Sequence, residues 1–141
     1  MTQLTPADAQ AILAENFPPW IRDLHLRFET IEPGRVVLRL PNNPKLARVG
    51  GILCGQAIMA VADTAMVFAV TSALKRFVNM ATVTQTTSFF RAVADMDVLC
   101  DTRVIRLGQS LAFGEAVFRS VEREEPFAQA SLTYALLTGA R

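Results

Sequence analysis

The chain has 141 residues, of which 51% are hydrophobic and 19% are charged. This length favours a single folded domain with its own core, and the composition excludes a disordered chain. The formal net charge is +1, and basic and acidic residues are spread along the chain, which argues against a nucleic-acid partner. So small a charged fraction predicts that a second copy of the chain covers part of the surface.

The N-terminal residues and the cysteines predict a cytoplasmic protein. Residues 1–8 lack the basic and then apolar pattern of a secretory signal. Cys54 and Cys100 lie in unrelated contexts without the spacing of metal ligands. We therefore expect two reduced thiols and predict no metal or other cofactor.

The first third of the chain predicts a short helix followed by a β-hairpin. Residues 5–16 begin with a capping hydroxyl, a proline and an acid at the spacing of a helix start, and two prolines follow the segment. Apolar and polar residues alternate over 24–28, which is strand spacing. The sequence Glu-Pro-Gly-Arg at 32–35 is typical of a turn, so residues 36–40 are expected to pair with the preceding strand.

Residues 55–76 form the most informative segment, because they are apolar on nearly every face of a helix. The length alone would permit a membrane span. However, Gln56 and Asp63 lie within it, and an aspartate at the middle of a membrane costs roughly 2.5–3.5 kcal/mol on insertion scales. Because strand-like segments occur on both sides, we expect a helix buried in a soluble domain and no membrane partner.

Four strand-like runs follow this helix, at residues 81–90, 98–107, 111–121 and 127–137. Long consecutive strands with short connections indicate an antiparallel sheet, here a four-strand meander. The expected fold class is α+β, with the antiparallel sheet wrapped around the long apolar helix. We expect one domain over residues 1–141, in which 1–19 form the N-terminal helix and lead-in. The hydroxyl residues expected to share one face of their strand are Thr82, Thr84, Thr86 and Ser88.

Two motifs accompany this order of elements: Gly-Gly-Ile-Leu-Cys-Gly-Gln at 50–56 and Ala-Val-Ala-Asp-Thr-Ala at 60–65. Together they resemble the hotdog-fold acyl-CoA thioesterases of the PaaI-like family. Members of that family open the central helix with a His-Gly-Gly or related turn and place an acidic residue two turns later. The Ala-Thr and Phe-Phe-Arg ends of the segment 81–91, Gly108 and the alanine-rich last strand also resemble the family. The resemblance extends over residues 20–138.

The resemblance implies hydrolysis of an acyl-CoA thioester by three residues of this chain. The backbone N–H of Gly55 is expected to polarise the thioester carbonyl, and the Asp63 carboxylate to attack that carbonyl or to activate water. Thr82 is expected to position the water. The chain departs from the family pattern at Cys54, where much of the family has histidine, and at Arg48, where many members have asparagine.

The chemistry of Gly55 and Asp63 also supports these roles without the family. The first N–H groups of a helix lack internal partners and can bind an oxyanion. An acid within an apolar helix is expected to be functional or, alternatively, to be bonded to a strand or a partner subunit. The two residues are eight positions apart, which is ~12 Å along a helix, so one thioester carbon cannot contact both in one chain. We therefore predict a homodimer with shared active sites, assembled further as a dimer of dimers.

Four further residues are candidates for substrate binding. Gln56 lies on the same helical face as Asp63 and is expected either to hold the substrate or to cap the helix. Cys54, beside the helix start, is interpreted as a small packing group in preference to a nucleophile, which would need a nearby base. Arg48 and Arg91 flank loops and are either contacts for CoA phosphates or ordinary surface charges.

Two other functions stay open at this point. A hotdog dehydratase or hydratase uses a histidine together with an acid, but the only histidine, His25, is remote in sequence from the central-helix motif. A non-catalytic acyl-CoA-binding or sensor protein of the same fold is the second alternative, because the motif histidine is missing.

Overall fold

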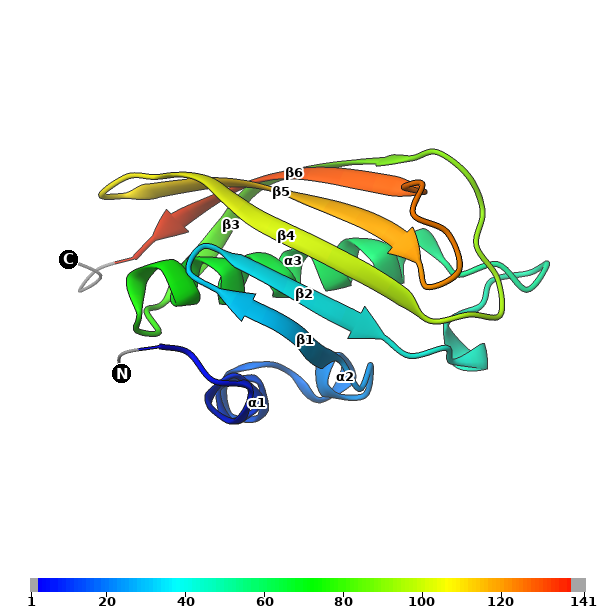
Figure 1. Cartoon of the computed structure of the whole chain (residues 1–141), viewed down its shortest axis with the longest axis horizontal. Coiled ribbons are helices and arrows are strands. Elements are labelled where there is room, and N and C mark those ends of the chain that lie inside the picture. The colour runs from blue at the N-terminus through cyan, green and yellow to red at the C-terminus, as the bar shows by residue number, and fades with distance from the viewer. Residues whose placement is uncertain (1–2, 138–141) are drawn as a thin grey trace.

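The fold is an antiparallel sheet that arches over one long helix, as the computed structural model describes for residues 3–137 (Figure 1). The elements in chain order are α1 (Pro6–Asn16), α2 (Pro19–Arg22), β1 (Arg27–Glu32), β2 (Arg35–Leu40), a 3-10 helix (Pro44–Leu46), α3 (Gly55–Leu74), β3 (Met80–Phe89), β4 (Val98–Leu107), β5 (Leu111–Ser120) and β6 (Ala128–Leu136). The helix α3 lies beneath the sheet, and α1 and α2 lie on the side opposite β5 and β6 (Figure 1). The expected class, a sheet wrapped around a central apolar helix, is confirmed.

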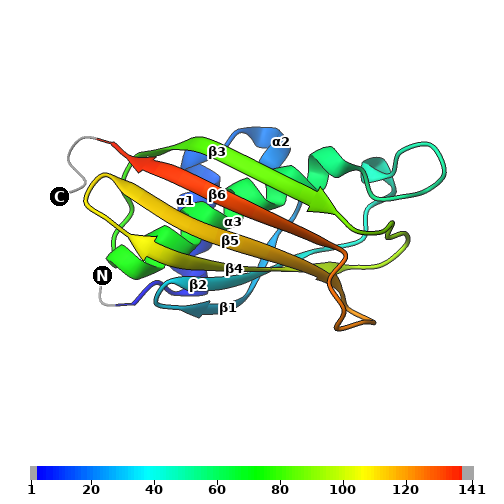
Figure 2. The same cartoon turned by 90° about the horizontal axis from the view of Figure 1, so that it is seen from above.

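The order of the strands corrects one expectation. The order is β1-β2-β4-β5-β6-β3, so the four strands after α3 do not form a simple meander. Instead, β3 pairs with β6 at one edge of the sheet, and β4 pairs with β2. The eight residues 90–97 can reach ~26 Å, which exceeds three strand spacings of ~4.8 Å each. This connection carries the chain across the end of the sheet (Figure 2).

Most predicted boundaries agree with the structure to within two residues, but β1 starts later than the alternation suggested. Leu24 and Leu26 are buried although they precede the strand. Between them, His25 takes a positive φ of 56° and turns the chain. The strand therefore begins at Arg27.

A bulge in β3 corrects the expected arrangement of its hydroxyl groups. Thr82 lies opposite Tyr134 of β6, whereas Thr84 lies opposite Thr133, so the register shifts at Val83. Residues directly opposite one another in an antiparallel pair share a face. Thr82 therefore faces α3 together with the buried Tyr134, and Thr84 lies on the outer face. The prediction that Thr82 shares a face with the following hydroxyl residues is wrong.

The helix α3 forms the centre of the core. It is long and apolar enough to cross a membrane by composition, but 67% of its most apolar stretch is buried within the protein. Phe68 is fully buried, and the ring of Phe17 stacks on it with centroids 5.7 Å apart, which attaches the N-terminal segment to the helix. One face of α3, which includes Gln56 and Asp63, is at least partly exposed.

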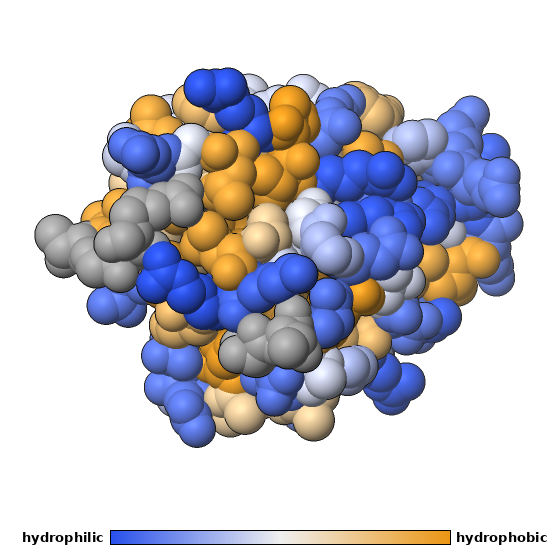
Figure 3. All heavy atoms as spheres, turned by 60° about the vertical axis from the view of Figure 1, so that its left-hand side comes forward, coloured by the Kyte–Doolittle hydropathy of each residue, from blue (hydrophilic) through white to orange (hydrophobic). Residues whose placement is uncertain are grey.

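Apolar side chains are also exposed on the sheet. Figure 3 shows a broad apolar area at the end of the molecule toward which α3 runs. The large exposed apolar residues on β3 to β5 and after β6 are Val83, Phe89, Ile105, Leu111, Phe113 and Leu137. Exposed apolar area of this kind favours contact with a further subunit.

Gly114 on β5 is predicted to be essential for the packing of the sheet on α3. A Cβ atom at this position would lie 2.5 Å from Met66 Sδ and 2.7 Å from the backbone oxygen of Arg103. The Met66 side chain can move, but the Arg103 carbonyl belongs to the neighbouring strand. We expect Gly114→Ala to lower the free energy of unfolding by about 1–3 kcal/mol, measured by urea denaturation. An unchanged denaturation midpoint would contradict this close approach.

Candidate active site

The Asp63 carboxylate is held by hydroxyl groups from two strands. Thr82 Oγ1, on β3, donates a hydrogen bond to Asp63 Oδ1 at 2.6 Å. The single hydrogen of the Tyr134 hydroxyl, on β6, is shared between the same Oδ1 and the backbone carbonyl of Asp63. Because Thr82 and Tyr134 lie opposite one another, the pairing of β3 with β6 brings both hydroxyls to the same carboxylate.

Asp63 is only partly buried and borders open space. A hollow of about 270 Å³ lies beside it, with Phe17 and Val67 among its apolar walls. One of the alternatives expected for Asp63, a hydrogen bond to a strand, is therefore present. A carboxylate that is held at one oxygen and faces a hollow can also serve as a base or a nucleophile.

Tyr134 is a member of this group that the sequence analysis missed. Its side chain is only 2% exposed. Burial, and secondarily the Asp63 carboxylate, raise the pKa of the Tyr134 phenol above its ordinary value, so the hydroxyl remains a donor. The only sequence signal was a single hydroxyl on the apolar face of the last strand, where a buried tyrosine usually requires a hydrogen-bond partner.

Gly55 is the first residue of α3, and its N–H therefore has no partner within the helix. The N-cap residue is Cys54, whose side chain makes no capping hydrogen bond. A Cβ atom built on Gly55 would lie 3.3 Å from Cζ of Phe89, a residue that is 49% exposed. A side chain at Gly55 would therefore compete with the Phe89 ring for the space beside the helix start.

Gly55 and Asp63 lie in separate hollows of the same chain. Gly55 borders a hollow of about 220 Å³ that also contains Phe89, whereas Asp63 borders the one that contains Thr82. The strand β3 runs back along α3, so its two ends lie at these two residues. Within one chain the structure does not bring the two predicted reacting groups together.

Cys54 and Gln56 line a third and larger hollow, of about 610 Å³, beside the first turn of α3. Trp20, which is 60% exposed, and Leu46 form apolar parts of its wall. Both predicted residues thus lie next to Gly55 rather than next to Asp63.

Arg48 and Arg91 both line the hollow that contains Gly55. Arg91 Nη2 donates to the backbone carbonyl of Glu125 at 2.7 Å, and Nη1 donates to the Glu125 carboxylate at 3.3 Å. Arg48 is exposed, and its Nη1 donates to the Val49 carbonyl at 3.1 Å. Two positive charges therefore lie near the start of α3, of which Arg91 is already paired with an acid.

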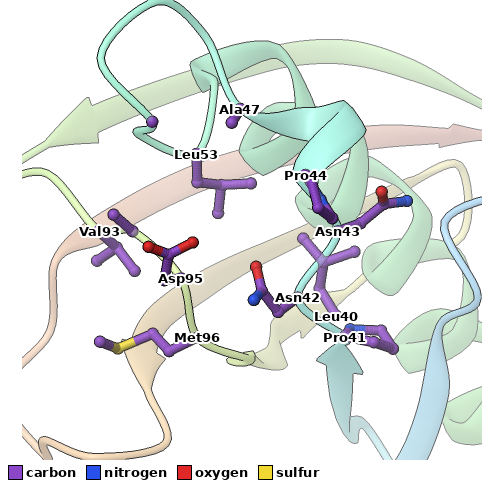
Figure 4. Close-up of a pocket in the computed structure, with 12 residues that line it drawn as sticks. Leu40, Pro41, Asn42, Asn43, Pro44, Ala47, Leu53, Val93, Asp95 and Met96 are labelled. Atoms are coloured by element: carbon purple, nitrogen blue, oxygen red, sulfur yellow. The ribbon is translucent and has the colours of Figure 1, made fainter.

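A narrow cavity of about 20 Å³ lies between residues 40–53 and 93–96 (Figure 4). Asp95 and Asn42 extend into it from the two segments. Its volume is sufficient for about one water molecule, and none of the predicted site residues lines it.

Comparison with known proteins identifies the family. Residues 50–127, which are more than half of the chain and contain Gly55, Asp63 and Thr82, match the family model described as "Thioesterase superfamily". The chain belongs to the thioesterase superfamily. Membership supports hydrolysis of acyl thioesters as its general activity.

Individual relatives of this thioesterase-superfamily chain agree with that assignment. The Thermoplasma volcanium protein named "Putative esterase TV1331" is 31% identical over 103 residues, which cover 70% of this chain and 73% of the relative. The conserved protein PA5202 from Pseudomonas aeruginosa has a TM-score of 0.78 and 27% identity, covering 86% of this chain and 95% of its own. The PaaI protein of the Escherichia coli phenylacetic acid degradation operon has a TM-score of 0.82 at 15% identity, covering 95% and 94%.

These findings confirm the resemblance to hotdog thioesterases at the level of fold and superfamily. The likeness to PaaI is too low in identity to carry more than the fold. The roles of Gly55, Asp63 and Thr82 therefore remain predictions for this thioesterase, to be judged on their geometry.

Proposed function

We propose that this chain hydrolyses an acyl-CoA thioester to a free acid and CoA, with Asp63 as its reacting carboxylate. The observation that carries the proposal is the environment of Asp63, the only acidic residue of α3. Two hydroxyl groups hold one of its oxygens, and the side chain borders a hollow. This arrangement suits a carboxylate that must act in a fixed orientation.

Two routes from this geometry give the same products. In the first, Asp63 takes a proton from water while the water oxygen bonds to the carbonyl carbon. The Gly55 N–H binds the resulting oxyanion, the C–S bond then breaks, and the CoA thiolate takes up the proton. In the second, Asp63 attacks the carbonyl itself, CoA leaves, and water hydrolyses the acyl-aspartate anhydride. The Thr82 hydrogen points to Asp63, so the lone pairs of Thr82 Oγ1 remain to accept a hydrogen bond from that water.

A two-fold dimer would bring Gly55 of one chain to Asp63 of the other. The strand β3 is an edge of the sheet, is ten residues long and carries exposed apolar side chains at Val83 and Phe89. An unpaired edge of this kind is a template for pairing with a second copy. If two β3 strands pair antiparallel about an axis near their middle, the Asp63 end of one lies beside the Gly55 end of the other. Such a dimer completes a site that one chain lacks, and the other exposed apolar surface suits a dimer of dimers.

The neighbourhood of Gly55 suits the two parts of an acyl-CoA. The hollow beside the first turn of α3, with Trp20 and Leu46 in its wall, offers apolar surface for an acyl group. Arg48 and Arg91 line the hollow that contains Gly55 and offer positive charge for CoA phosphates, although Arg91 also pairs with Glu125. A soluble substrate of this kind fits a cytoplasmic protein.

Hydrolysis is tested by measuring thiol release from short, medium and aryl acyl-CoAs by the purified protein. We expect turnover of at least one substrate, undiminished by a chelator, because only carboxylate, hydroxyl and backbone groups are used. Activity that is lost on chelation and restored by a divalent ion would contradict this mechanism. Tight acyl-CoA binding without hydrolysis would support the non-catalytic binding protein instead.

A further inference from the structure

We infer that Tyr134 is a positioning residue for Asp63: with Thr82 it holds Oδ1, so that Oδ2 is the oxygen that reacts. The inference rests on the proposed hydrolysis and specifies which atom of Asp63 takes the proton from water or forms the new bond to the carbonyl carbon.

The hydrogen bonds around Asp63 are all on one side of its carboxylate. Oδ1 accepts from Thr82 Oγ1 at 2.6 Å and from the Tyr134 hydroxyl. Among residues 3–137 no donor reaches Oδ2. Two hydrogen bonds stabilise negative charge on Oδ1 and occupy its lone pairs, whereas the lone pairs of Oδ2 stay free. The carboxylate is therefore held in one orientation with a single available oxygen.

Tyr134 supplies the more rigid of the two contacts. Its strand, β6, is paired on both sides, with β5 and with β3, whereas Thr82 lies on the edge strand. The Tyr134 ring is almost fully buried, and its hydroxyl also contacts the backbone carbonyl of Asp63. The same side chain thus fixes the position of α3 over the sheet and the rotation of the carboxylate.

The chemical state of Tyr134 suits this role. Burial, and secondarily the neighbouring carboxylate, raise the pKa of its phenol, so the hydroxyl keeps its hydrogen at neutral pH. Tyr134 is thus a constant donor, and phenylalanine at this position would keep the ring while removing only that donor.

The kinetic test compares Tyr134→Phe with the wild type on the best acyl-CoA. Loss of a hydrogen bond to a charged group is expected to lower kcat roughly 10- to 100-fold, with KM within about twofold, because the hydroxyl orients the reacting group and does not bind substrate. Leu132→Val is the matched control, since Leu132 is buried on the same face of β6 two residues away. It should lower thermal stability and leave kcat unchanged. A kcat of Tyr134→Phe close to that of the wild type, or an equal loss of kcat in Leu132→Val, would overturn the inference.

A second test needs neither activity nor a folded Phe variant. Tyr134 is the only tyrosine of the chain, so tyrosine labelled with ¹³C at Cζ gives one assigned resonance. If the hydroxyl donates to the carboxylate, Asp63→Asn is expected to move this resonance at neutral pH, because the amide oxygen is a weaker acceptor than the carboxylate. The same resonance in both proteins at neutral pH would show that the contact is absent and would overturn the inference. The labelled protein reports on this contact even if the acyl-CoA panel gives no hydrolysis, so failure of the inference and failure of the proposed function are distinguished.

Discussion

Asp63→Asn is expected to lower kcat by about 10²- to 10⁴-fold, while the protein folds and assembles as the wild type does. The asparagine carbonyl oxygen can still accept hydrogen bonds from Thr82 and Tyr134, so the local packing is kept. However, an amide cannot take a proton from water or act as the nucleophile at neutral pH. Steady-state CoA release measures kcat, and size-exclusion chromatography measures assembly.

Asp95→Asn provides the matched control for the loss of one negative charge. Asp95 is exposed, lines neither the hollow of Gly55 nor that of Asp63, and has a positive φ of 54° that asparagine also adopts readily. We expect its kcat to equal that of the wild type.

Near-normal turnover by Asp63→Asn would contradict the proposed mechanism. A failure of that variant to fold would instead assign Asp63 a structural role.

The features that the sequence predicted well are those determined by local pattern. The apolar run that becomes α3 is longer than an ordinary strand, so it predicts a buried helix. The unusual position of Asp63 within that helix was therefore predictable as well. The start of α3 at Gly55 followed from the glycine-rich turn before it. Separation of Gly55 from Asp63 followed from the rise of a helix alone.

The features that the sequence did not predict depend on contacts between distant segments. Nothing local indicates that β3 pairs with β6 rather than with β4, because both arrangements give the same alternation. The bulge at Val83 reverses the face of Thr82, and strict alternation cannot show it. Alternation in the last strand puts Tyr134 on the same face as its apolar residues, but the contact of Tyr134 with Asp63 joins residues 71 positions apart.

The claim that each active site takes Gly55 from one chain and Asp63 from the other can be tested with a variant that removes the N–H of Gly55. Gly55→Pro does so at the first position of a helix, where proline is well tolerated. The preceding residue, Cys54, has φ −74° and ψ 149°, a conformation that proline requires of its neighbour. Gly55→Ala is the matched control, because its Cβ meets the same Phe89 ring and its N–H is retained. We expect the proline variant to lose about 10²- to 10³-fold in kcat and the alanine variant to lose far less.

The most direct measurement mixes Asp63→Asn chains with Gly55→Pro chains and follows CoA release after subunit exchange. Each variant alone should be nearly inactive. In a mixed dimer with shared sites, one site receives both substitutions and the other receives neither. Half of the dimers in a random equal mixture are mixed, and each has one intact site, so activity should recover to about a quarter of the wild-type value. No recovery, with mixed dimers confirmed by mass spectrometry, would place both groups in one chain and contradict the shared site.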